Sequence, residues 1–125
     1  MLALRLTSYA STQWSWTGPA YVTCDRTSEI NPIRHPMVEQ LAATDGSRST
    51  LIVRERISGR ATCAPEPRTV TPTDYDQIIV AASQWPADHV LVETAPGLPI
   101  RVTAGAARTT PLYLAHGQGV LRASR

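Results

Sequence analysis

Short runs of alternating apolar and polar residues dominate the chain and predict an abundance of β-strands. The first run, Leu2–Thr7, places its three leucines on one face. Trp14–Thr17 alternates in the same way and puts both indoles on one face. Gly18-Pro19 then interrupts the pattern before Ala20–Cys24 resumes it as a strand. The beginning of the chain is therefore expected to lie in a sheet.

The central part of the chain predicts a short helix and a hairpin. After a polar connection from Asp25 to His35, the segment Pro36–Ala43 is suited to a helix, with proline in the permitted first turn. Thr50–Ile57 has the β-branched, apolar composition of a strand. Ser58-Gly59 predicts a tight reversal into Arg60–Ala64, which would complete a hairpin.

The strongest helical signal covers Thr73–Trp85. Its apolar residues recur at helical spacing along one side, and acidic residues in the first turn suit the helix dipole. Thr73 or Thr71 can cap the first turn, and Pro86 ends the helix.

Two more hairpins are expected in the last third. One pairs His89–Thr94 with Pro99–Thr103, and the other pairs Leu112–His116 with Val120–Ser124. The total is about eight strands and two helices, with no internal repeat. The sequence therefore predicts a single domain over residues 1–125, with an α+β fold and a mostly antiparallel sheet.

Composition agrees with a globular domain and argues against some partners. Hydrophobic residues make up 42% and charged residues 18% of the chain, as in ordinary folded domains. The net charge is +2, and the arginines are scattered rather than clustered, so no nucleic-acid partner is expected. No apolar stretch approaches membrane-spanning length and no signal peptide is evident, which predicts a cytoplasmic protein without a membrane partner.

Candidate catalytic and metal-binding groups are sparse. The three histidines lie far apart in the sequence, and none has the helical spacing of a zinc-binding pair. Cys24 and Cys63 lack metal-ligand spacing, and whether they pair with one another stays open. We therefore predict no catalytic set, no metal site and no cofactor.

The aromatic residues offer the best candidates for ligand contact. Trp14 and Trp16 stand two apart on a predicted strand beside Gly18-Pro19, an arrangement suited to line a groove for a peptide. Tyr113, on a strand of the closing hairpin, is a third candidate. The alternative is that all three are ordinary core residues.

The closing third contains, in order, the segments Ala81–Trp85, Asp88–Glu93, Ile100–Thr103, Pro111–Ala115 and Leu121–Ser124. This succession resembles the N-terminal glutaminase-like domain of the asparagine synthetase family, which includes β-lactam synthetases and lasso-peptide cyclases. The resemblance covers about residues 72–124. Pro111-Leu112-Tyr113 is its most specific part.

The departures from the family pattern concern catalysis. Active members expose a cysteine nucleophile after removal of the initiator methionine, whereas Leu2 follows Met1 here. The family's Arg-Asp-x-x-Gly motif is replaced by Ala104–Arg108. The resemblance thus implies a degenerate, truncated version of an Ntn-hydrolase-like domain.

The resemblance implies a non-catalytic accessory role beside an ATP-dependent, amide-forming synthetase domain or subunit in peptide or natural-product biosynthesis. A peptide would be the substrate. Two alternatives stay open at this point. In the first alternative, the chain is a stand-alone module that binds a peptide or small ligand. In the second, it is a small enzyme of unknown reaction.

Overall fold

The computed structural model describes residues 3–7, 13–23, 26–31, 36–57, 66–105, 113–117 and 120–124. Within them the chain forms eleven strands and one helix. The strands are β1 (Ala3–Thr7), β2 (Trp14–Trp16), β3 (Tyr21–Thr23), β4 (Glu29–Asn31), β5 (Val38–Thr44), β6 (Ser49–Glu55), β7 (Arg68–Thr69), β8 (His89–Thr94), β9 (Arg101–Ala104), β10 (Tyr113–Gly117) and β11 (Val120–Ser124). The helix, α1, covers Pro72–Ser83.

The fold is mostly β, so the predicted α+β class, with about eight strands and two helices, is wrong. The strands form two sheets. Sheet A has the order β10-β11-β1-β4-β3-β2, and sheet B has the order β7-β5-β6-β8-β9. Among the described strands, every pairing is antiparallel except that of β5 with β7.

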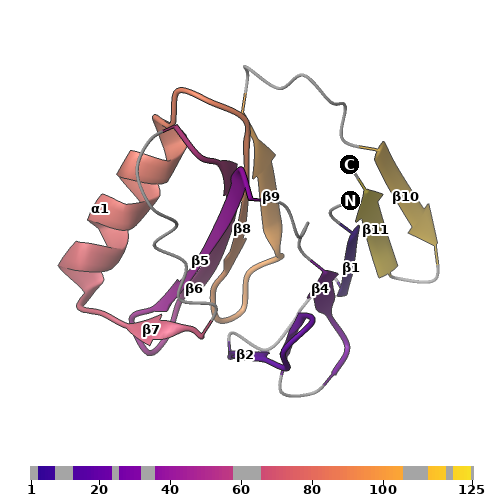
Figure 1. The fold of residues 1–125 in the computed structure, drawn as a ribbon. Coiled ribbons are helices and arrows are strands. Elements are labelled where there is room, and N and C mark those ends of the chain that lie inside the picture. The colour runs from indigo at the N-terminus through magenta and orange to yellow at the C-terminus, as the bar shows by residue number, and fades with distance from the viewer. Residues whose placement is uncertain are drawn as a thin grey trace.

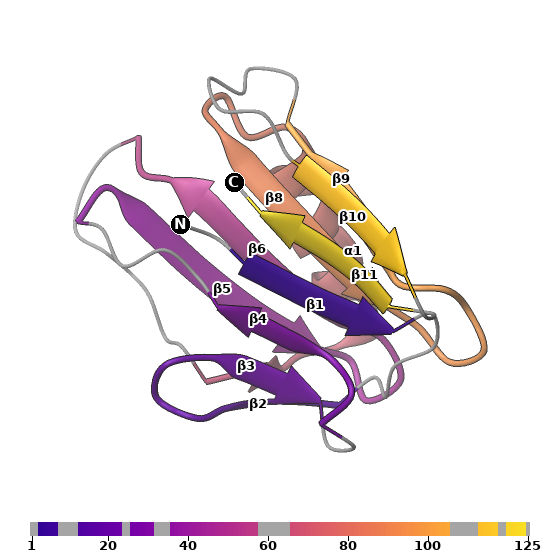
Figure 2. The ribbon, with the colours of Figure 1, turned by 90° about the vertical axis from the view of Figure 1, so that its right-hand side faces the viewer.

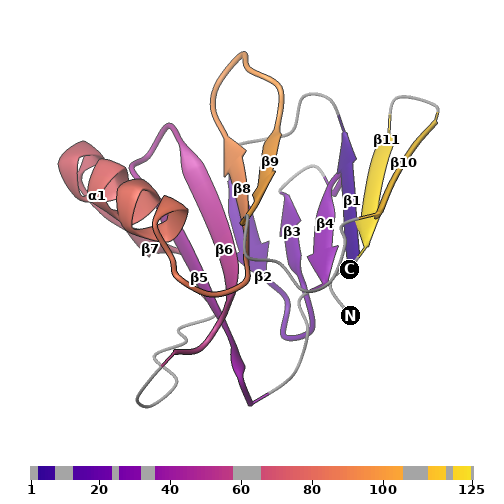
Figure 3. The ribbon, with the colours of Figure 1, turned by 90° about the horizontal axis from the view of Figure 1, so that it is seen from above.

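The molecule has three layers. Figure 1 shows α1 on the outer face of sheet B, with sheet A stacked on its other face. Figure 2 looks through sheet A onto sheet B and shows the strands of both sheets running in similar directions. The view from above in Figure 3 gives the same order of helix, sheet B and sheet A. Sheet B is therefore covered on both faces.

The first and last described strands pair with each other inside sheet A. Ala3 of β1 lies opposite Ser124 of β11, and β11 pairs in turn with β10. The closing hairpin predicted from the sequence is therefore present, with the residues between its strands outside the described part. Segments from the two ends of the chain thus build one edge of the same sheet (Figure 2).

Apolar residues fill both faces of sheet B. The inter-sheet core, between sheets A and B, contains the buried residues Tyr21, Ile30, Ala42, Leu51, Val53, Val90 and Val92. The helix-side core, beneath α1, contains Ile52, Ala82 and Leu91, with Leu41, Ile78 and Ile79 packed against them. Consecutive residues of one strand thus serve different cores, because side chains alternate across a sheet.

The helix predicted at Pro36–Ala43 is wrong, because most of this segment lies in strand β5. Val38–Thr44 pairs with β6 over its whole length. Both faces of β5 carry apolar residues, Ala42 toward sheet A and Leu41 toward the helix. A strand that is covered on both faces loses the polar–apolar alternation by which strands are recognised, and its pattern then resembles that of a helix.

Other differences concern short strands and one hairpin. β4 lies within the predicted polar connection, and β7 has only two residues. The expected hairpin partner of Thr50–Ile57, at Arg60–Ala64, falls outside the described residues. The described strand β6 pairs with β5 on one side and β8 on the other.

Helix α1 agrees closely with its sequence signal. The Thr71 hydroxyl accepts a hydrogen bond from the Asp74 backbone N–H at 3.1 Å, which identifies Thr71 rather than Thr73 as the N-cap. Pro72 occupies the first turn, where a missing N–H costs nothing. The buried residues of the helix, Tyr75 and Ala82, face sheet B. The helix ends at Ser83, just before the predicted stop.

Candidate ligand-binding site

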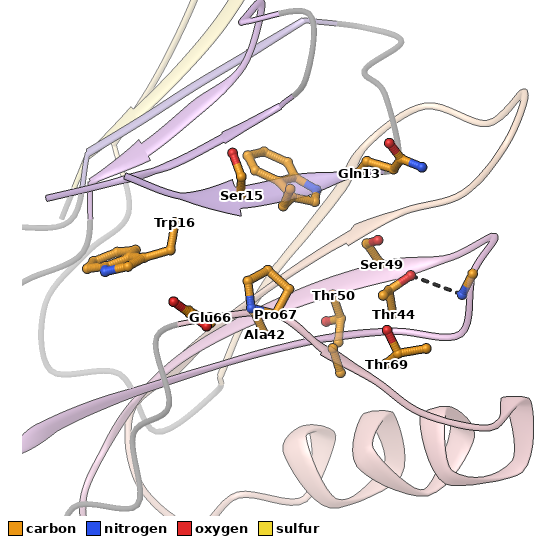
Figure 4. A pocket seen from close by; sticks show the side chains of 13 residues that line it. Gln13, Ser15, Trp16, Ala42, Thr44, Ser49, Thr50, Glu66, Pro67 and Thr69 are labelled. Carbon is orange, nitrogen blue, oxygen red and sulfur yellow. Dashed lines mark hydrogen bonds between the residues drawn. The ribbon is translucent and has the colours of Figure 1, made fainter. Parts of the chain in front are cut away.

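A cavity of about 600 Å³ opens between the edge strands of the two sheets, β2 of sheet A and β7 of sheet B. Figure 4 shows its lining, which combines Trp16 and its neighbours on β2 with the end of β5, the start of β6 and the segment leading into β7. The lining residues are Gln13, Trp14, Ser15, Trp16, Ala42, Ala43, Thr44, Gly46, Ser49, Thr50, Glu66, Pro67 and Thr69. We call it the inter-edge cavity.

Both sequence-predicted tryptophans belong to the inter-edge cavity. Trp14 and Trp16 are half-buried and pack against the inter-sheet core, whereas Ser15 between them is exposed. The alternation predicted from the sequence therefore places both indoles on the inner face of sheet A. Each indole both borders the inter-sheet core and lines the cavity. The interpretation of these tryptophans as core residues is therefore compatible with their interpretation as ligand contacts.

The two indoles are held in position by neighbouring residues. Trp14 Nε1 donates a long hydrogen bond of 3.4 Å to the Thr94 hydroxyl of sheet B. The rings of Trp16 and Tyr21 have centroids 4.6 Å apart and are tilted by 54°, a favourable aromatic geometry. A ligand entering the cavity would therefore meet aromatic surfaces that are already oriented.

Most hydroxyls along the cavity are engaged within the protein. Thr50 Oγ1 donates to the Val92 carbonyl at 3.2 Å, and Thr44 Oγ1 donates to the Arg48 carbonyl at 2.8 Å. Thr44 Oγ1 also accepts from the Gly46 N–H, as the dashed line in Figure 4 marks. These hydroxyls stabilise the β5–β6 turn and sheet B, so their protons are not available to donate to a ligand.

Glu66 is the one charged residue among those that line the inter-edge cavity in the described part of the chain. Its side chain is exposed, and it lines the same cavity as Trp16 and Pro67 (Figure 4). The arrangement brings a carboxylate to a wall of two indoles. Such a surface suits a ligand that has both an apolar and a cationic part.

A second cavity, also of about 600 Å³, lies between the start of α1 and the β8–β9 turn. Its charged groups are paired. Arg101 Nη2 lies 2.8 Å from Glu93 Oε2, and Arg48 Nη1 lies 2.8 Å from Asp76 Oδ1. Burial raises the pKa of its Tyr75 phenol to about 12. Because these charges are already satisfied, this cavity is the weaker candidate.

The β5–β6 turn between the two cavities is organised by Asp45. Its Oδ1 accepts the backbone N–H groups of Ser47 and Arg48 at 3.0 and 2.7 Å, and its Oδ2 accepts Arg48 Nε at 2.8 Å. The Arg48 backbone N–H above all holds the pKa of the Asp45 carboxyl well below its ordinary value, with the Ser47 N–H and the Arg48 side chain adding to the shift. The carboxylate form thus stabilises the turn.

Asp45 is expected to make folding stability depend on acidity. Because the pKa of Asp45 is lower in the folded state than in the unfolded state, its contribution to folding stability is complete above about pH 5. This contribution is lost as the pH falls through the pKa of the unfolded state toward the pKa of the folded state. We expect Asp45→Asn to unfold at lower urea concentration than the wild type near neutral pH, and the two proteins to converge as pH falls toward about 2. Urea titrations across this range test it, and parallel curves at all pH values would contradict it.

The third predicted ligand residue does not join the two tryptophans. Tyr113 begins β10, and β10 and β2 are the opposite edge strands of sheet A. Strands β11, β1, β4 and β3 lie between them. The three predicted residues therefore share a sheet but not a site.

Of the other candidate groups considered in the sequence, the structure describes the side chain of His89. His89 is buried in β8, with Nδ1 3.1 Å from the Ala87 carbonyl oxygen, and it lines a smaller cavity of about 340 Å³ near the end of α1. His35, Cys24 and Cys63 lie outside the described residues.

Within the described ranges, no group of three or more histidine, cysteine, aspartate or glutamate residues could hold a metal ion. No helix there has the length and apolar character of a membrane span.

Sequence reasoning missed the sheet B side of the inter-edge cavity. Glu66, Pro67 and Thr69 fall in a segment that the prolines mark as a loop, and no local pattern shows that it lies against β2. The juxtaposition arises because β7 pairs in parallel with β5, with Ala43 opposite Arg68. Only the pairing of strands distant in sequence brings these residues to the tryptophans.

Comparison with known proteins adds no relative. No protein-family model matches the sequence, and neither the curated proteins nor the solved structures give a significant match.

Proposed function

We propose that this protein is a binding module that takes a short peptide or a small ligand of similar size in the inter-edge cavity. The observation that carries the proposal is the convergence of Trp14 and Trp16 from sheet A with Glu66 from sheet B around one cavity of about 600 Å³. Ligand sites in proteins have this size and combine apolar walls with a few polar groups.

The lining favours binding over catalysis. Among the described residues around the inter-edge cavity, Glu66 is the one titratable side chain, so the lining offers no acid–base pair and no nucleophile beside a base. The indoles supply contact area at low conformational cost, because each has only two side-chain torsions. These features support recognition of a ligand without chemical change.

The test uses the indole N–H resonances of the protein. The chain contains three tryptophans, and the Trp85 indole donates to the Glu55 carbonyl at 2.7 Å, away from the cavity. Capped tetrapeptide pools, each enriched in one residue class, are titrated into protein labelled with ¹⁵N. We expect at least one pool to shift the Trp14 and Trp16 resonances and to leave Trp85 unchanged.

A cavity-filling variant provides the control for location. Thr69 is exposed and lines the inter-edge cavity, so Thr69→Tyr should weaken binding by about tenfold or more by occupying it. Thr73→Tyr, at an exposed position of α1 that does not line the cavity, should bind as the wild type does. Peptides that shift no indole resonance, or only that of Trp85, would refute the proposal.

The accessory role beside an ATP-dependent synthetase is a second, compatible proposal. It is favoured by the segment from Pro111, which contains the paired strands β10 and β11 where the resemblance expects a hairpin. The bound peptide would then be the substrate of the synthetase. Release of ammonia from glutamine by the purified chain would contradict this non-catalytic role.

For either role we propose a cytoplasmic location, supported by the globular composition.

A further inference from the structure

Two arginines of this protein are held in the same way, each between an aromatic ring and at least one carboxylate. The Arg54 guanidinium lies 3.7 Å from the centre of the Trp85 ring, and its Nε is 2.7 Å from Glu39 Oε1. The Arg48 guanidinium lies 4.3 Å from the centre of the Tyr75 ring. Its Nε and Nη1 are each 2.8 Å from the carboxylates of Asp45 and Asp76.

The inter-edge cavity repeats the aromatic and carboxylate parts of this arrangement. Trp14 and Trp16 provide the rings and Glu66 provides the carboxylate. None of the described residues that line the cavity is cationic. Within the described part of the chain, the Glu66 side chain makes no ion pair, in contrast to Glu39, Asp45 and Asp76.

We propose that the inter-edge cavity takes the arginine side chain of a short peptide, with the guanidinium against the indole wall and paired with Glu66. This inference rests on the proposed binding function and names the class of ligand. Charge complementarity favours a cation, because an anionic group would meet the Glu66 carboxylate without a compensating positive charge among the lining residues that the structure describes.

Arginine fits these partners better than lysine does. Its planar, weakly hydrated guanidinium stacks on aromatic faces and pairs with a carboxylate through a fork of N–H donors. A lysine ammonium is a strongly hydrated point charge that gains less from an indole wall. The Glu66 carboxylate supplies the charge pairing and the two indoles supply the stacking on which this preference for arginine rests.

The experiment compares three capped tripeptides in which glycine flanks a central arginine, lysine or citrulline. Citrulline keeps the shape of arginine without its charge. Affinities are measured by calorimetry, and the Trp14 and Trp16 indole resonances report the location. We expect the arginine peptide to bind most tightly and the citrulline peptide to bind about tenfold or more weakly. Added salt should reduce this difference.

A matched pair of variants isolates the carboxylate. Glu66→Gln should reduce affinity for the arginine peptide about tenfold and leave the citrulline peptide unaffected. Glu55→Gln removes the same charge from an exposed residue of β6 that does not line the cavity, and should bind as the wild type does. Both positions are exposed, so neither substitution should impair folding.

The outcomes separate this inference from the proposed function. Equal binding of the arginine and citrulline peptides at Trp14 and Trp16 would overturn the inference and leave the binding function intact. Agmatine, a free guanidinium compound, binding as tightly as the arginine peptide would overturn the peptide assignment. If no tripeptide and no tetrapeptide pool shifts Trp14 or Trp16, both the inference and the proposed function fail.

Discussion

Leu51→Ala is expected to lower the free energy of unfolding by about 2–5 kcal/mol. Leu51 is 2% exposed and lies in the inter-sheet core, where it packs among residues from both sheets. Truncation removes buried apolar contacts and leaves a space that a close-packed sandwich can fill only in part. Since small domains are stable by about 5–15 kcal/mol, urea unfolding should show a large decrease in midpoint.

The neighbouring residue provides a matched comparison on the other face of the same strand. Ile52 is 1% exposed but belongs to the helix-side core, so Ile52→Ala should cost a similar amount through the packing of α1. Leu51→Ala should shift the indole resonances of Trp14 and Trp16, which pack against the inter-sheet core. Ile52→Ala should leave them nearly unchanged.

An exposed leucine controls for the chemistry of the substitution. Leu98 is 60% exposed in the β8–β9 turn, and Leu98→Ala should change stability by less than about 0.5 kcal/mol. If Leu51→Ala were as mild as this control, the stacking of sheet A on sheet B would not be a source of stability. Equal indole shifts in the Leu51 and Ile52 variants would contradict the assignment of these residues to separate cores.

Elements with a local signature were predictable from the sequence. Strand β8 has the predicted bounds, His89–Thr94, because a compact β-branched run stands between a proline and a turn. Helix α1 was predictable because Thr71 and Pro72 mark its start and its apolar spacing marks its buried side. The shared face of Trp14 and Trp16 followed from alternation alone.

Elements defined by tertiary context were not predictable in the same way. Whether Val38–Thr44 is a helix or a strand is decided by what covers its two faces, and those covers are sheet A and α1. The three residues of β4 are too few to carry a periodic signal. Glu66 enters the candidate site only through the β5–β7 pairing, which depends on contacts between distant segments.

Removal of the Arg54 side chain is the second change expected to have a large effect. Arg54 and Glu39 lie on the helix side of sheet B, and their side chains are only 15% and 9% exposed. Arg54→Met would leave the Glu39 carboxylate largely buried without its cation, a loss of about 3–5 kcal/mol. Because the pair is mostly shielded from solvent, added salt should change this loss little.

A double variant distinguishes the effect of an unpaired, buried Glu39 carboxylate from the effect of lost packing on Trp85. The Arg54 guanidinium also stacks on Trp85, so part of the effect of Arg54→Met could come from that contact. Glu39→Leu combined with Arg54→Met removes both charges and should recover most of the stability, since apolar residues can replace a buried ion pair without net loss. If the double variant is as unstable as Arg54→Met alone, in urea unfolding followed by tryptophan fluorescence, packing on the Trp85 indole contributes more to stability than the ion pair does. Recovery would instead show that Arg54 matters to folding chiefly as the partner that Glu39 requires once α1 covers sheet B.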